Sequence, residues 1–224
     1  MEVKQSTLQN GLTIISDYFP TVESVSLQIA VNVGSRNETK AENGISHFIE
    51  HMAFKGTKNR TAKQIAEEFE DIGGFFNAYT SRDKTVFYCK CLKEDAPIAI
   101  DILSDIVLNS IFAEEEIERE RQVILQELAN CLDTPDDIIF DYFQETAYPN
   151  QSLGRSILGP KENISNFTKQ EIKDYFFKYY TANNMVIAAS GNLKHDDLHS
   201  LTEKYFSKLE SLGKTPIQKG DYQG

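Results

Sequence analysis

Two histidines and a glutamate in the stretch His47-Phe48-Ile49-Glu50-His51 could support metal chemistry. On a helix, residues four apart share a face, with Cβ atoms about 5–6 Å apart, so both imidazoles can reach one metal ion. Glu50 is adjacent to His51 and one turn from His47, so its carboxylate can reach a water on that metal. The order His-x-x-Glu-His inverts the commoner zinc helix and occurs in metallopeptidases. The pattern therefore predicts a hydrolytic metal site.

A hydrolytic zinc ion usually takes three protein ligands and keeps one position for water. Residues 114–127 are rich in strong helix formers and contain no glycine or proline, so they predict a helix. Glu120 and Glu127 are seven residues apart and return to nearly the same face of that helix. One of them can bind the metal while the other orients a ligand. The spacing alone does not decide between them.

Length, composition and charge narrow the class of protein. The 224 residues are 40% hydrophobic and 25% charged, as expected for a globular domain. We expect no membrane partner, because no apolar run approaches the ~20 residues of a membrane helix and the N-terminus lacks a secretory hydrophobic segment. The net charge of -11 argues against nucleic acid and suits basic or neutral peptides. Cys89, Cys91 and Cys131 form no C-x-x-C pair, so we expect free thiols in a reducing compartment.

The hydrophobic periodicity predicts an α+β fold. Strands are expected at 3–8, 12–18, 25–33, 75–80, 85–92 and 185–190. Helices are expected at 44–53, 61–72, 96–109, 113–130, 135–147, 168–179 and 196–206. We expect residues 1–210 to form one domain and the polar, glycine-containing tail 211–224 to begin a linker.

Several segments together resemble a known family. The zinc helix at 47–51 is followed, 76 residues after His51, by Glu127, and the stretches 73–83 and 153–159 resemble further family motifs. The chain is similar from Thr7 to Leu209 to the inverted-motif zinc peptidases of the pitrilysin and insulinase type. Within that type it most resembles the catalytic subunit of mitochondrial processing peptidase and bacterial relatives. The resemblance implies a mostly antiparallel sheet covered by helices.

The resemblance also implies roles for individual residues. It selects His47, His51 and Glu127 as ligands of one Zn²⁺ per chain, and Glu50 as the general base that activates zinc-bound water. Glu120 would support a histidine ligand.

Substrate contacts are implied in two places. Asn77 and Ala78 would contact an extended peptide added to an edge strand at 75–80, unless this is an ordinary core strand. Asp137 and Asp141 would receive an arginine two residues before the cut, unless they only favour the start of their helix.

Family members typically carry two such domains in tandem, and this chain resembles the N-terminal, metal-bearing half. We therefore expect a zinc-dependent endopeptidase domain for extended, basic peptides or presequences that needs a C-terminal half or a partner subunit. The alternative is a noncatalytic, metal-binding structural or peptide-binding subunit. We expect the bacterial cytoplasm, or alternatively the mitochondrial matrix.

Overall fold

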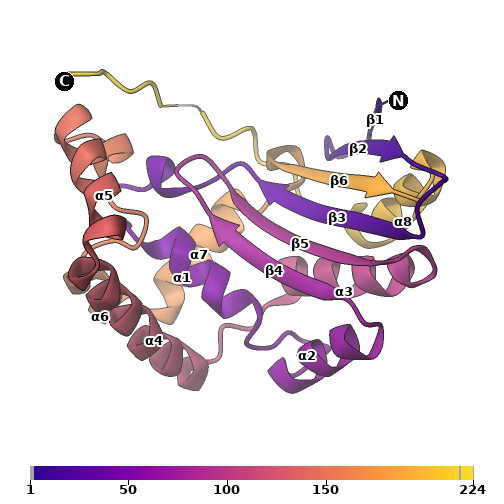
Figure 1. Ribbon diagram of the computed structural model, residues 1–224, viewed down its shortest axis with the longest axis horizontal. Helices are drawn as coiled ribbons and strands as arrows, with labels where there is room; N and C mark the ends of the chain where they lie inside the picture. The colour runs from indigo at the N-terminus through magenta and orange to yellow at the C-terminus, as the bar shows by residue number, and fades with distance from the viewer. Residues whose placement is uncertain (1–2, 217, 224) are drawn as a thin grey trace.

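The computed structural model describes residues 3–216 and 218–223, and Figure 1 shows helices packed against one twisted sheet. The sheet has six strands in the order β1-β2-β6-β3-β5-β4. The strands are β1 Val3–Thr7, β2 Thr13–Tyr18, β3 Ser24–Val31, β4 Phe75–Thr80, β5 Thr85–Leu92 and β6 Met185–Gly191. Only β2 and β6 pair in parallel, so the sheet is mostly antiparallel, as predicted.

Eight α-helices accompany the sheet in the described part of the chain. They are α1 Ile45–Ala53, α2 Ala62–Asp71, α3 Ala96–Asn109, α4 Glu114–Asp133, α5 Pro135–Ala147, α6 Lys161–Asn166, α7 Lys169–Tyr179 and α8 His195–Phe206. Short 3-10 helices occur at η1 Ser35–Asn37, η2 Lys93–Asp95, η3 Ser152–Gly154 and η4 Ala182–Asn184. None of the helices in the described residues is long and apolar enough to cross a bilayer.

The helices cover one face of the sheet and leave the other open. On β3, Val25, Leu27 and Ile29 are at most 3% exposed, whereas Gln28 between them is exposed. This alternation follows from the two-residue period of a strand. The buried side chains face α3 and α8, and α1 packs beside β4 and β5 at the far end of the sheet (Figure 1). The zinc-helix candidate is thereby placed next to the edge strand.

The predicted strands and seven of the helices are confirmed, with differences at some ends. Helix α4 ends at Asp133, three residues beyond the end that was predicted from the sequence pattern alone. Helix α1 ends at Ala53, as predicted. The six-residue helix α6 was not predicted, since it is too short to show a helical period.

Candidate metal centre

Helix α1 presents its two histidines on the side opposite its apolar residues. Phe48, Ile49 and Met52 are at most 1% exposed and fix the helix against the core. His47 and His51 therefore turn toward α4, which packs against α1. The helix starts after Gly44, whose φ of 100° is rarely open to other residues.

The start of α1 is held by groups far away in sequence. A Cβ on Gly44 would lie 2.7 Å from the Leu158 carbonyl oxygen, and one on Gly159 would lie 2.4 Å from the Asn43 carbonyl oxygen. The backbones of residues 43–44 and 158–159 are therefore in direct contact where α1 begins.

Glu38 supplies the N-terminal cap that Gly44 cannot provide. Its buried carboxylate accepts hydrogen bonds from the backbone amides of Gly44 and Ser46 and from Asn43 Nδ2, each at 2.9 Å. These amides are among the donors that a helix leaves without partners at its start. Sequence reasoning missed this residue, since it lies outside the helix and reaches it only through a loop.

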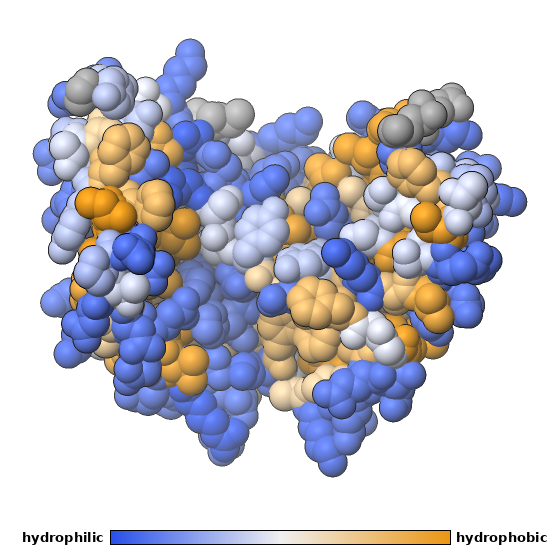
Figure 2. Space-filling model, viewed as in Figure 1, coloured by the Kyte–Doolittle hydropathy of each residue, from blue (hydrophilic) through white to orange (hydrophobic). Residues whose placement is uncertain are grey.

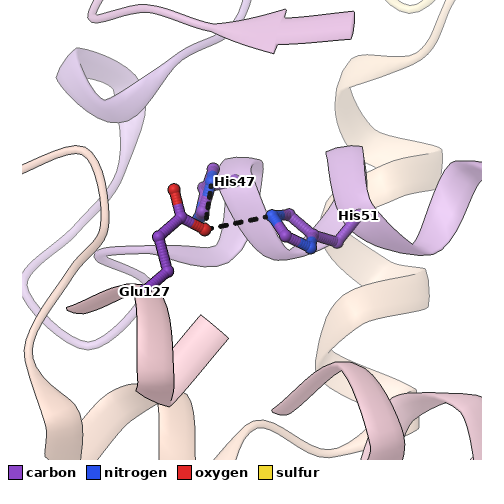
Figure 3. Close-up of side chains that lie close together, drawn as sticks. All are labelled: His47, His51 and Glu127. Atoms are coloured by element: carbon purple, nitrogen blue, oxygen red, sulfur yellow. Dashed lines mark ion pairs between the residues drawn. The ribbon is translucent and has the colours of Figure 1, made fainter. Parts of the chain in front are cut away.

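Three potential metal ligands meet between α1 and α4 (Figure 3). Glu127 Oε2 lies 3.6 Å from His47 Nε2 and 3.4 Å from His51 Nε2. The ligand atoms of the three residues all lie within 4.8 Å of one another. The structure thus brings together the two histidines and the glutamate that the resemblance selected.

Glu120 lies behind His51 rather than among the three potential ligands. Its buried carboxylate is 3.1 Å from His51 Nδ1 and 2.7 Å from Lys55 Nζ. A proton on His51 Nδ1 is donated to Glu120, so in the neutral ring the lone pair is on Nε2, the nitrogen that faces Glu127. Such a carboxylate–histidine contact commonly fixes the tautomer of a metal ligand.

The pKa shifts of the three potential ligands act in different directions on metal binding, favourable at His47 and Glu127 and opposed at His51. Burial and the neighbouring His51 lower the pKa of His47 to about 4, against the opposing charge of Glu127. The hydrogen bond from His51 lowers the pKa of Glu127. Burial lowers the pKa of His51, but the carboxylates of Glu127 and Glu120 outweigh this and raise it. Two imidazoles and a carboxylate are a donor set that suits zinc, so these residues fit the ion.

Glu50 stands beside the three potential ligands, and its carboxylate is bound by a strand residue. Burial raises its pKa, and a hydrogen bond from Thr80 opposes that rise. The Thr80 hydroxyl donates to Glu50 Oε2 at 2.5 Å. Sequence reasoning did not single out Thr80, because its contact depends on how α1 and β4 pack.

The candidate peptide-binding residues lie on a free sheet edge. Strand β4 pairs only with β5 and ends the sheet, so the prediction of an edge strand is confirmed. Asn77 is exposed and Ala78 is 8% exposed, and the Ala78 amide donates to Asn77 Oδ1 at 2.8 Å.

The two candidate specificity carboxylates lie on α5 in different surroundings. Asp137 is exposed in the first turn of α5, as the helix-start alternative also requires. Asp141 is half-buried and lies 3.2 Å from Arg82 Nη2, and Arg82 Nε donates to the Leu153 carbonyl oxygen. This ion pair with the β4–β5 turn was not predicted.

Next to Asp141 is a cavity of about 560 Å³ between α4, α5 and the loop after α5. Its lining is mixed and includes the apolar Leu128, the polar Cys131 and Tyr142 and the charged Arg155. In Figure 2, hydrophobic residues gather over α5 and along β4, with hydrophilic surface between them.

An inverted His-x-x-Glu-His helix facing a glutamate helix beside a sheet edge defines the class of inverted-motif metallopeptidase domains. The family model described as Insulinase (Peptidase family M16) matches residues 13–161. A second model, described as Peptidase M16 inactive domain, matches residues 166–223. The chain belongs to the insulinase family of peptidases, M16, and the resemblance seen in the sequence is confirmed.

Named relatives agree with this membership. An uncharacterized zinc protease of Rickettsia felis is 49% identical over 98% of this chain and 53% of its own length. The mitochondrial-processing peptidase subunit beta of Neurospora crassa is 45% identical over 93% of this chain and 44% of its own. The crystal structure of a protease from Helicobacter pylori matches with a TM-score of 0.92 and 28% identity, over 99% of this chain and 54% of that one. The chain spans about half the length of these relatives.

Proposed function

We propose that this chain is the zinc-bearing half of an endopeptidase that cleaves extended peptides, with Glu50 as general base. The observation that carries this proposal is the group formed by His47, His51 and Glu127, with Glu50 on the same helix. A merely structural zinc would be expected to have four protein ligands, whereas this group has three.

The proposed roles follow from the donor set. His47, His51 and Glu127 would hold one Zn²⁺, which supplies a Lewis acid and acidifies water. Glu120 holds the His51 ring in the tautomer that presents Nε2. Glu50 takes a proton from the attacking water and returns it to the leaving amine of the peptide.

The free edge of β4 is the proposed peptide-binding surface. An extended peptide can add to this edge through main-chain hydrogen bonds, which depend little on its sequence, and Asn77 and Ala78 would lie along it. Asp137 and Asp141 would give a preference for a basic side chain near the cut. Because Arg82 already pairs with Asp141, an incoming guanidinium would share that carboxylate.

The whole enzyme is proposed to contain a second half. The edge strand and the metal ligands form only one wall of a site, and closing a site strengthens its electrostatic stabilisation. Helix α5 carries exposed apolar side chains, among them Phe140 at 70% and Phe143 at 61% exposed, which a second half or partner subunit could cover. Residues 1–210 would then be one domain and 211–224 the start of the linker. A bacterial cytoplasm or mitochondrial matrix remains the expected location, in keeping with the bacterial and mitochondrial names of the relatives.

A noncatalytic structural or peptide-binding subunit is the second candidate function. It is favoured by the description of the second family model, which names an inactive domain. That model matches residues 166–223, however, and all three candidate ligands and Glu50 precede this stretch. We therefore prefer the peptidase.

Zinc analysis and a peptidase assay separate these functions. The protein containing this chain and its second half should bind one zinc and cleave a quenched-fluorescent basic peptide. Glu50→Gln should keep the zinc and lose cleavage, and Glu70→Gln, at an exposed position on α2, should change neither. Wild-type zinc affinity in His47→Ala or Glu127→Gln would refute the ligand assignment, and full activity in Glu50→Gln would refute the base.

A further inference from the structure

Thr80, the last residue of β4, makes a short contact with the proposed base. Its hydroxyl donates to Glu50 Oε2 at 2.5 Å. Within the described residues, it is the only side chain that hydrogen-bonds to Glu50. An O–H···O⁻ bond of this length is charge-assisted and about twice as strong as a neutral one. The hydroxyl engages Oε2, and the backbone of Thr80 is a further hydrogen-bond partner of the same carboxylate.

The packing of strand β4 against α1 fixes the backbone that precedes Thr80. Side chains alternate along the strand, so Phe76, Ala78 and Thr80 share the face that packs on α1. The Phe76 and Phe54 rings lie 5.4 Å apart between the strand and the end of α1. The contact between Thr80 and Glu50 is therefore part of a packed boundary between the edge strand and the metal helix.

The turn after Thr80 holds it from the other side. The Ser81 amide donates to the Lys84 carbonyl oxygen at 2.8 Å, and the Arg36 amide donates to the Arg82 carbonyl oxygen at 2.9 Å. A Cβ on Gly34 would lie 2.2 Å from the Ser81 carbonyl oxygen, so the two backbones are in direct contact. Thr80 thus sits on a strand end with little freedom to move.

We propose that Thr80 is a positioning residue for Glu50. This inference rests on the proposed function of Glu50 as base. The Thr80 hydroxyl fixes the carboxylate so that Oε1 is directed to the attacking water. Since Thr80 also ends the edge strand proposed to take the peptide, one strand would align both the substrate and the base.

A structural comparison tests the contact without depending on activity. Thr80→Val removes the hydroxyl and keeps the β-branched shape that suits a strand. In crystal structures of the zinc-loaded 224-residue chain, we expect the Glu50 carboxylate to rotate or become disordered in this variant. An unchanged Glu50 orientation would overturn the proposal.

Kinetics of the protein containing both halves test the consequence. Thr80→Val should lower kcat about tenfold to a hundredfold, the usual range for a hydrogen bond to a charged group, with KM within about twofold. Thr80→Ser keeps a hydroxyl and should restore most of kcat. Thr85→Val is the matched control, because the Thr85 hydroxyl donates to the Val33 carbonyl oxygen and not to Glu50. It should lower the Tm and leave kcat unchanged.

Parallel assays of wild type and Glu50→Gln distinguish the failure of the proposed function from the failure of this inference. An inactive wild type, or an active Glu50→Gln, speaks against the proposed function, and the orientation of Glu50 in the crystals then decides on Thr80 alone. With an active wild type and an inactive Glu50→Gln, a Thr80→Val variant at wild-type kcat overturns the inference. A Thr80→Ser variant as slow as Thr80→Val does so too.

Discussion

At the scale of single residues, the two ring nitrogens of His51 contact different carboxylates. Its Nδ1 contacts Glu120, and its Nε2 faces Glu127. The first contact sets the tautomer, while the second completes the group that fits zinc. The same two carboxylates make His51 easier to protonate in the metal-free chain, so proton and metal compete for one ring.

This competition predicts how zinc affinity depends on pH. The metal-free pKa of His51 is raised above its ordinary value of 6.5. Zinc must displace that proton at any pH below the pKa, so affinity should fall about tenfold per pH unit there, and the fall should begin above 6.5. Glu120→Gln removes one of the carboxylates that raise the pKa, so the fall should begin at lower pH. Competition with a chelating indicator measures this, with Glu67→Gln on the exposed face of α2 as control. An onset at the same pH in Glu120→Gln would contradict the prediction.

Asp141 gives a second prediction at this scale. If its carboxylate receives a basic side chain, Asp141→Asn should reduce the preference for arginine over alanine two residues before the cut by about tenfold or more. Asp136→Asn, at an exposed position in the first turn of α5, should leave the preference unchanged. The ratio of kcat/KM for two matched peptides measures it. Equal cleavage of both peptides by the wild type would remove the basis for this role.

How far the candidate site could be predicted differs between its residues. His47, Glu50 and His51 follow from their own spacing, because an i, i+4 pair on a helix is local geometry. Glu127 required the resemblance, since helix α4 offers several glutamates. The contacts of Thr80 and Glu38 could not be predicted, because they arise from the packing of α1 against β4 and from the path of a loop.

At the scale of elements, the start of α1 depends on one buried carboxylate. Glu38→Ala would leave the amides of Gly44 and Ser46 without acceptors in a buried place. We expect a loss of about 3 kcal/mol in the free energy of unfolding, or a Tm lower by roughly 6–12 °C, together with weaker zinc binding. Thermal unfolding and zinc titration measure both effects.

Glu42→Ala is the control for this element. The Glu42 side chain also accepts from a backbone amide, that of Thr39, but this hydrogen bond is open to solvent, so its loss should cost under about 1 kcal/mol. Equal effects of the two substitutions would show that burial of the Glu38 cap is not what stabilises the helix.

Most elements could be predicted because their signals are local. The capping box at Thr61 and Gln64 marks the start of α2, and the alternation around Leu27 marks β3. The parallel pairing of β2 with β6 joins segments about 170 residues apart, and no local pattern reveals it. A six-residue helix such as α6 likewise shows no period.

At the scale of the whole molecule, the chain alone should separate metal binding from catalysis. The three proposed zinc ligands lie entirely on α1 and α4, so the 224-residue chain should bind one zinc. Its open metal-bearing side should make it a poor peptidase, with kcat/KM at least about a hundredfold below that of the protein containing both halves. Adding the second half in trans should restore cleavage. Full enzymatic rates from the purified monomer alone would disprove the need for a second half.

The touching backbones of Gly44 and Gly159 set an order of assembly. The start of α1 can reach its final packing only after the segment around Gly159, more than 100 residues later, has docked on it. During synthesis, a nascent chain that ends before this segment should therefore hold α1 loosely, and zinc should bind late. Pulsed hydrogen exchange during refolding would show this as protection of the α1 amides that appears together with that of α6, the helix directly after Gly159, and not before it. Early, independent protection of α1 would mean that the helix forms before the segment around Gly159 packs against it.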